Sequence, residues 1–172
     1  MAELTVSGTT HPILKDDYAS DWMGIEVVAL DDGHATIRMA LRQEMLNGFG
    51  MAHGGMIFAF GDTAFALACN PANPDPADEG NITVASGVDI NFLKPAFRGQ
   101  VLTAVANRRA STGRSGLYDI QIYAADPGTA LPTAAPAGTA PVPTAPGELP
   151  TDIAPGELVA EFRGRSRTIS KK

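Results

Sequence analysis

Asp62 lies in the apolar run Met56–Cys69. It is the only residue between His53 and Asp75 that carries a charge at neutral pH. Burying a lone carboxylate costs several kcal/mol unless a partner compensates it. One interpretation is structural, with an arginine or a backbone N–H group paired with Asp62. The other is chemical, because a partly buried carboxylate can attack an acyl carbon as a nucleophile or activate a water molecule as a general base.

A glycine-rich turn, Asn47-Gly-Phe-Gly-Met-Ala-His-Gly-Gly55, comes just before this run. A helix that begins at Gly54 and Gly55 leaves the N–H groups of its first turn without intrahelical partners, and its positive end lies there. Glycine also lets a carbonyl group approach the backbone closely. The turn could therefore stabilise the oxyanion of an acyl-transfer reaction, with Gly55 as the candidate amide. A plain turn at His-Gly-Gly is the alternative.

Two polar neighbours have both a chemical and a structural interpretation. Asn47 could orient a water molecule or the His53 ring, but Asn-Gly is also a common turn dipeptide. Thr63 could hydrogen-bond Asp62, or it could donate to a carbonyl of its own helix, as threonines inside helices usually do.

The spacing along the helix separates these groups. His53 and Asp62 would be about half a turn and roughly 13 Å apart, while Gly55 and Asp62 would share a face at about 10 Å. Neither pair can contact one acyl group within a single chain. A two-fold homodimer with antiparallel helices would bring Asp62 of one chain beside Gly55 of the other, which predicts two shared active sites per dimer.

The surrounding pattern predicts an α+β fold. Two runs, 25–30 and 34–41, flank an Asp-Asp-Gly turn and predict a hairpin. Residues 54–70 are apolar at almost every helical angle, which indicates a central helix enclosed on most sides. Further strands are expected at 82–93, 100–110, 117–124 and 157–169. An antiparallel sheet wrapped around the helix accounts for all of them.

The chain is expected to form one domain over residues 1–172. Residues 1–12 show no periodic pattern, and a short helix is expected after them. Eight of the thirteen prolines fall between Asp126 and Pro155, where large apolar side chains are almost absent. This composition predicts a loop-like or disordered insert that decorates the domain. The strand after it should pair with 117–124.

Composition excludes several classes of function. A net charge of −6 argues against nucleic-acid binding. Neither a signal peptide nor a run long enough to cross a bilayer is evident, which predicts a cytoplasmic protein without a membrane partner. His11 and His34 lack partners at metal-ligand spacing, so we expect surface histidines and no metal. Gly48-Phe-Gly50 lacks the rest of a nucleotide-binding signature, so no nucleotide cofactor is expected.

Longer motifs resemble a known family. Asn47-Gly-x-Gly-x-x-His53-Gly-Gly55, followed by Phe58 and Asp62-Thr-Ala-Phe-Ala-x-Ala-Cys-Asn70, is similar to the hotdog-fold acyl-CoA thioesterases of the phenylacetate-degradation type. The likeness covers about residues 13–125 and 157–169. It includes Asp89-Ile-Asn-Phe-Leu-Lys-Pro95, Gly116-Leu-Tyr-Asp-Ile-Gln-Ile122 and Phe162-Arg-Gly-Arg-Ser-Arg167. The proline-rich insert departs from the family, which has a short hairpin there.

The resemblance implies a hotdog fold, side-by-side dimers, often paired into tetramers, and hydrolysis of acyl-CoA thioesters without a further cofactor. It implies that Asp62 is the catalytic carboxylate and Gly55 the oxyanion amide, that Asn47 and His53 position the thioester and water, and that Thr63 lies near the carboxylate.

Subfamily likeness suggests phenylacetyl-CoA or hydroxyphenylacetyl-CoA as the substrate, although medium-chain acyl groups also fit an apolar pocket. Phe49, Phe58 and Phe65 are candidates to line that pocket. Lys94, Arg109 and Arg114 are candidates to bind the CoA moiety, and each could equally be an ordinary solvated charge. A non-catalytic acyl-CoA-binding hotdog module is the alternative function, and a hotdog hydratase is a third.

Overall fold

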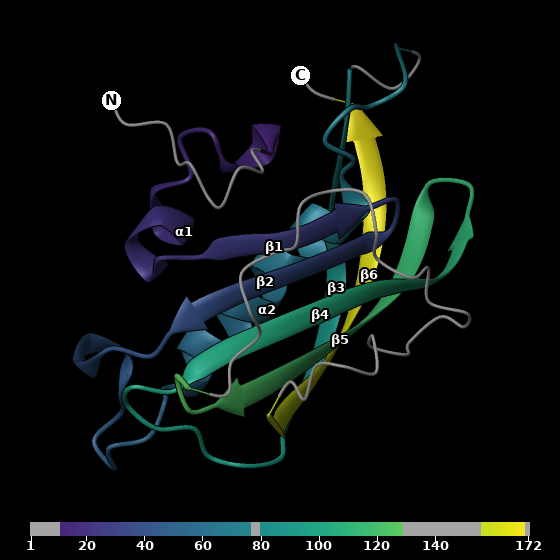
Figure 1. Ribbon diagram of the computed structural model, residues 1–172. Coiled ribbons are helices and arrows are strands. Elements are labelled where there is room, and N and C mark those ends of the chain that lie inside the picture. The colour runs from purple at the N-terminus through teal and green to yellow at the C-terminus, as the bar shows by residue number, and fades with distance from the viewer. Residues whose placement is uncertain (1–10, 77–79, 129–155, 171–172) are drawn as a thin grey trace.

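The computed structural model describes residues 11–76, 80–128 and 156–170. Nearly all of the predicted insert at 126–155 lies outside the described residues. In the described part, six strands form one sheet in the order β1-β2-β4-β5-β6-β3, and every neighbouring pair is antiparallel (Figure 1). The strands are β1 (Glu26–Asp31), β2 (His34–Ala40), β3 (Asn81–Phe92), β4 (Val101–Thr112), β5 (Ser115–Ala125) and β6 (Glu157–Ser170).

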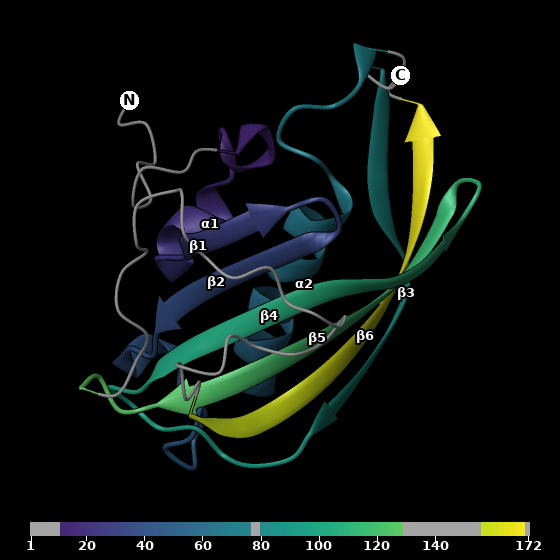
Figure 2. The same ribbon diagram turned by 45° about the vertical axis from the view of Figure 1, so that its right-hand side comes forward.

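The helix α2 (Gly54–Cys69) is the centre of the fold. The sheet curves around one side of it, as Figures 1 and 2 show, and the buried core lies between them. Glycine allows the close approach, because a Cβ atom at Gly61 would lie 3.0 Å from the Phe162 ring and 3.1 Å from Ile122. This arrangement confirms the predicted hotdog architecture.

Smaller elements fill the ends of the fold. A 3₁₀ turn η1 (Pro12–Leu14) and the short helix α1 (Tyr18–Met23) precede β1, and a second 3₁₀ turn η2 (Gln43–Met45) follows β2. The predicted short helix is confirmed in α1. The side chain of Asp17 caps it by accepting a hydrogen bond from Ser20 N at 3.1 Å, and Gly24 ends it in the left-handed conformation, with φ of 70°.

The prediction that His11 and His34 are surface residues is wrong. His11 is only 4% exposed, because its Nε2 donates to Asn70 O at the end of α2 (2.8 Å) while its Nδ1 accepts from Ile13 N. Burial lowers the pKa of His11, and the bond to Asn70 opposes this shift. His34 is half-buried, with one ring nitrogen 2.8 Å from Asn107 Oδ1 on β4.

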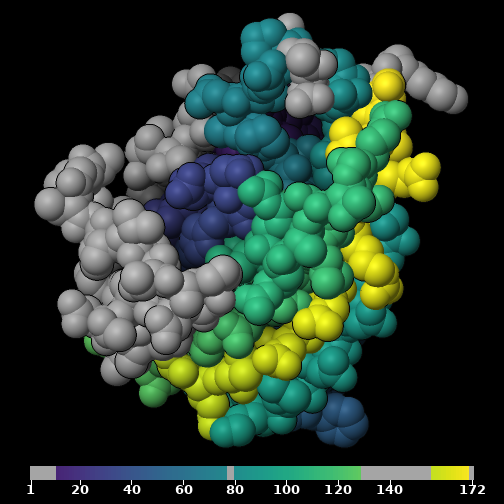
Figure 3. All heavy atoms as spheres, turned by 90° about the vertical axis from the view of Figure 1, so that its right-hand side faces the viewer, coloured from purple at the N-terminus to yellow at the C-terminus, as the bar shows by residue number. Residues whose placement is uncertain are grey.

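In the described part of the chain, the edge strand β3 pairs with another strand on one side only, and it has exposed apolar side chains. β6 pairs with β5, as predicted. It also pairs with β3, which is therefore the last strand at this edge of the sheet. Val84, Phe92 and Leu93 are 38%, 53% and 51% exposed at or just beyond this edge. In Figure 3, the side chains of β4 and β5 (green) lie beside those of β6 (yellow) on the face turned toward the viewer. An edge strand with exposed apolar side chains can pair with another strand.

Candidate active site

One stripe of α2 remains outside the core. Gly55 and Phe58 are exposed and Asp62 is half-buried, whereas the helix faces that meet the sheet are buried. These three positions follow the helical repeat, so they lie in a row along one face. The regular helix from Gly54 to Cys69 also confirms the distance on which the dimer prediction rests, because seven residues separate Gly55 from Asp62 by about 10 Å.

The Asp62 carboxylate has no protein partner in the described part of the chain. No hydrogen bond or ion pair from a described residue reaches it, so neither structural explanation raised for Asp62 is found in the described part of the chain. Burial raises the pKa of Asp62, so its carboxylate is a stronger base than an exposed one. A half-buried, unpaired carboxylate on an open helix face is the arrangement expected of a reactive group rather than of a structural one.

The first turn of α2 distributes its backbone donors unequally. The ring Nδ1 of His53, the N-cap residue, accepts a hydrogen bond from Gly55 N at 3.0 Å. The backbone oxygen of His53 accepts from Met56 N at 2.9 Å. Gly54, the first helical residue, has no intrahelical partner for its N–H, and no other described group accepts from it. Gly55 is the amide that the sequence indicates, and in the structure its N–H donates to the His53 ring, whose position the glycine pair alone does not show.

Asn47 organises the turn that leads into α2. Its Oδ1 accepts from Phe49 N at 2.9 Å and from Met51 N at 3.3 Å, and its backbone N–H donates to Met51 O at 2.8 Å. These bonds support the turn interpretation of Asn-Gly. The carboxamide Nδ2 has no partner among the described residues, so it is available to a ligand.

Thr63 lies on the side of α2 that faces α1. Its hydroxyl donates to Ala59 O at 3.2 Å, the usual bond of a threonine inside a helix, and it lies 3.4 Å from Ser20 Oγ. The structure shows no bond between Thr63 and Asp62, so any contribution of Thr63 to the site stays a prediction.

The three candidate pocket phenylalanines do not converge within one chain. Phe49 is 86% exposed on the turn before α2, and Phe58 is 39% exposed on the open stripe. Phe65 is buried in the core, with its ring 5.3 Å from that of Tyr118. Of the three, Phe58 alone is exposed on the same helix stripe as Asp62, and its ring is 5.5 Å from that of Phe162.

The candidate CoA-binding cations lie far apart. Lys94 pairs with Glu157 at the start of β6, whereas Arg114 donates to Thr168 O near its end at 3.0 Å. Eleven residues of extended strand separate these two contacts, or roughly 35 Å, too far for one phosphate group to meet both cations.

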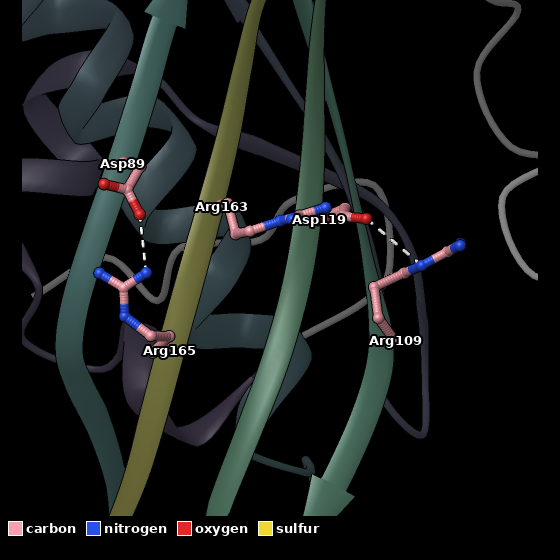
Figure 4. A network of polar contacts seen from close by, with 5 residues as sticks. All are labelled: Asp89, Arg109, Asp119, Arg163 and Arg165. Atoms are coloured by element: carbon pink, nitrogen blue, oxygen red, sulfur yellow. Dashed lines mark hydrogen bonds and ion pairs between the residues drawn. The ribbon is translucent and has the colours of Figure 1, made fainter.

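Arg109 lies on the sheet face that points away from α2. It pairs with Asp119 at 3.3 Å, and Arg163 pairs with the same carboxylate at 2.7 Å. Figure 4 shows this network together with the Arg165–Asp89 pair, with α2 behind the strands. A hollow of about 700 Å³ lies on this face, away from Asp62. Arg109 is therefore not brought near Asp62 within one chain.

Other reactive groups contribute little here. Burial raises the pKa of the Cys69 thiol to about 12, so this side chain is not a thiolate nucleophile at neutral pH. Among the described residues, no group of three or more His, Cys, Asp or Glu could hold a metal ion. No helix in the described ranges is long and apolar enough to cross a membrane.

Known proteins resemble this chain in sequence and in fold. The family described as the Thioesterase superfamily matches residues 49–131. The acyl-coenzyme A thioesterase PaaI of Escherichia coli (strain K12) is 39% identical over 112 residues, which cover 65% of this chain and 75% of that protein. A putative esterase of Archaeoglobus fulgidus is 29% identical over 108 residues, covering 63% of this chain and 66% of the relative.

A solved structure also resembles this chain. The E. coli PaaI protein from the phenylacetic acid degradation operon has a TM-score of 0.67 and 31% identity, and the match covers 93% of this chain and 90% of that one. The fold, the open helix with its carboxylate and these relatives lead to one conclusion. The chain belongs to the hotdog-fold acyl-CoA thioesterases represented by E. coli PaaI.

Proposed function

We propose that Asp62 carries out the chemical step of thioester hydrolysis. The observation that carries this proposal is its half-buried carboxylate, which has no partner among the described residues and lies on the open stripe of α2. As a nucleophile, Asp62 attacks the acyl carbon and expels the CoA thiolate, and water then hydrolyses the anhydride. As a general base, it takes a proton from water, whose oxygen adds to the same carbon before the thiolate leaves. Both routes release a free acid and CoA.

The oxyanion is assigned to the N–H of Gly54 rather than to that of Gly55. The Gly55 amide already donates to His53, whereas the Gly54 amide lies at the positive end of α2 with no acceptor in the described chain. A Cβ atom at Gly54 would lie 3.2 Å from the Phe92 ring, so this ring lies against the Gly54 Cα atom. A thioester oxygen placed there would receive a backbone hydrogen bond at the edge of an apolar wall.

The complete site requires two chains. Gly54 and Asp62 are eight residues apart on one helix, about 12 Å along its axis, so one acyl group cannot contact both. The edge of β3, with Val84 and Phe92, and the open stripe of α2, with Phe58, both expose large apolar side chains that a second copy can cover. A two-fold dimer that joins these surfaces places Asp62 opposite the partner's glycine turn. Association of two dimers into a tetramer, as the resemblance implies, completes this proposal.

The CoA moiety is assigned to the side of the site where Lys94 lies. Lys94 follows Phe92 by two residues, and the Phe92 ring lies against Gly54. Its exposed pair with Glu157 is of a kind that contributes little, so Lys94 can exchange that carboxylate for a phosphate of CoA. Arg109 and Arg114 lie farther along the sheet and are the weaker candidates.

The acyl group is proposed to be phenylacetyl or hydroxyphenylacetyl. Phe58 lies between the glycine turn and Asp62 on the open stripe, where its ring can contact an aromatic acyl group. Thiol release should be measured with phenylacetyl-CoA, hydroxyphenylacetyl-CoA and medium-chain acyl-CoA at equal concentration. We expect the highest kcat/KM for the aryl thioesters. A preference for medium-chain substrates would overturn the acyl assignment, and tight binding without product would favour the non-catalytic binding module.

A matched pair of substitutions tests the Gly54 amide. Gly54→Pro removes the N–H at the first helical position, where proline is tolerated, and His53 already has the extended backbone that precedes proline (φ −65°, ψ 130°). Gly54→Ala keeps the N–H and adds the same Cβ atom. We expect kcat of the proline variant to fall by about 10²–10³ relative to the alanine variant in the thiol-release assay. Equal activities would remove Gly54 from the site.

A further inference from the structure

The His53 side chain and the Gly55 amide form a closed local contact. His53 is the N-cap of α2, and its Nδ1 lies 3.0 Å from Gly55 N, which donates to it. A neutral imidazole has one nitrogen that donates and one that accepts. Because Nδ1 accepts a hydrogen bond from the Gly55 amide, the neutral ring must carry its own hydrogen on Nε2. The contact therefore selects one of the two tautomers of His53.

The selected tautomer has its donor free. His53 is exposed at the entrance of α2, and in the described ranges Nε2 has no hydrogen-bond partner. The ring is held two residues from Gly55 and next to Gly54, whose N–H also lacks an acceptor. Two neighbouring donors, the Gly54 amide and the Nε2–H group of His53, are thus present at the same end of the helix.

We propose that Gly55 is a positioning residue whose N–H fixes His53 as a hydrogen-bond donor to the thioester. The inference rests on the proposed function of the site. It assigns opposite roles to the two polar side chains: His53 donates a hydrogen bond through Nε2, and Asp62 is the group that accepts a proton or attacks carbon. His53 is not a general base, because its single acceptor nitrogen is occupied by the Gly55 amide.

Glycine at position 55 is part of this device. A Cβ atom there would lie 3.2 Å from His53 Nδ1 and 3.5 Å from Cε1, with no other group within 4 Å. The first distance is tighter than ordinary van der Waals contact, so a side chain at position 55 would make the ring shift by a few tenths of an ångström and weaken its bond to Gly55 N. Gly55→Ala therefore keeps the amide and the helix while it displaces the ring.

Nuclear magnetic resonance tests the contact without reference to activity. In uniformly ¹⁵N-labelled protein without substrate, we expect a scalar coupling across the hydrogen bond between Gly55 N and His53 Nδ1, and ring ¹⁵N shifts of the Nε2–H tautomer. The coupling should weaken or vanish in Gly55→Ala. An Nδ1–H tautomer, or no coupling in the wild type, would overturn the inference whatever the protein hydrolyses.

Three substitutions of His53 test the donor role. Asn, Asp and Ser can each cap the helix by accepting from the first-turn amides. The Asn side chain also presents an N–H donor beyond the acceptor, whereas ionised Asp has no hydrogen to donate and the single hydroxyl of Ser ends one atom short of the Asn amide nitrogen. We expect kcat of His53→Asn to remain within about tenfold of the wild type, and that of His53→Asp and His53→Ser to fall by about 10²-fold. The His53→Ser variant is the control for the negative charge that His53→Asp adds to the site.

The pH profile separates donation from proton abstraction. If His53 only donates, His53→Asn keeps the acid limb of the kcat/KM profile, since that limb belongs to Asp62. Loss of the acid limb in His53→Asn, or equal activity of the Asn, Asp and Ser variants, would contradict the donor role. A wild-type protein that hydrolyses no thioester, yet shows the Gly55–His53 coupling, would refute the proposed function and leave the contact established.

Discussion

Asp62→Asn is expected to lower kcat for thioester hydrolysis by about 10²–10⁴, because the amide can neither attack the acyl carbon nor take a proton from water. The substitution keeps the shape of the side chain, so KM should change much less than kcat. The acid limb of the wild-type kcat/KM profile should lie above pH ~4, the ordinary range of an aspartate, because burial raises the pKa of Asp62.

Thiol release from an aryl-CoA thioester measures this effect. The matched control is Glu161→Gln, the same carboxylate-to-amide change at an exposed position on the sheet face that points away from α2. The control should retain wild-type kcat. Wild-type turnover by Asp62→Asn would show that the carboxylate is not the reacting group, and the assignment of the site to the open stripe of α2 would fall with it.

Stability should change in the opposite direction from activity. A raised pKa means that the folded chain binds the Asp62 proton more tightly than the unfolded chain does, so ionised Asp62 costs stability, increasingly as pH rises above about 4. At neutral pH, Asp62→Asn should therefore melt at a higher temperature than the wild type, and the difference should disappear at lower pH, where Asp62 is protonated in both states. A lower melting temperature at neutral pH would instead indicate a stabilising partner for the carboxylate.

Much of the fold was predictable because its signals are local. Alternation predicted the hairpin and the last strand, and the helix prediction at 54–70 differs from Gly54–Cys69 by one residue, because apolar residues at all angles leave few other interpretations. The pairing of β6 with β3 was not predicted, since no residue pattern in either strand indicates which strand lies beside it. His11 was misplaced because an isolated histidine in an irregular segment carries no periodic signal of its burial.

The site was predictable only in part, for a related reason. Asp62 could be found from sequence because one charge in an apolar run is costly wherever the helix lies. Which of the Gly54 and Gly55 amides has an acceptor in the described chain could not, because it depends on the orientation of the His53 ring, which a tripeptide does not specify. Lys94, Arg109 and Arg114 were chosen by charge, and charge alone does not reveal that the contacts of Lys94 and Arg114 lie at opposite ends of β6.

Mixing two inactive chains should restore activity if the site is shared. A dimer of Asp62→Asn chains has no reactive carboxylate, and a dimer of Gly54→Pro chains has no oxyanion amide. In a mixed dimer one site carries both defects, but the other combines the intact Asp62 of one chain with the intact Gly54 of its partner. Random pairing at equal amounts makes half of the dimers mixed, so about a quarter of all sites should be intact.

Co-refolded chains with different tags allow this measurement. The mixed population should show about a quarter of wild-type thiol release, and the doubly tagged dimer, once purified, about half. Asp62→Asn mixed with Asp62→Ala is the control, because every pairing then lacks the carboxylate and no activity should return.

If the Asp62→Asn and Gly54→Pro mixture stays as inactive as the control while mixed dimers form, each site must lie within one chain. Such a site is not possible on this helix, because Gly54 and Asp62 of one chain are about 12 Å apart and cannot both contact one acyl group. Rescue would therefore locate catalysis at the contact between the two α2 helices, and it would explain why the described residues of one chain offer Asp62 no partner.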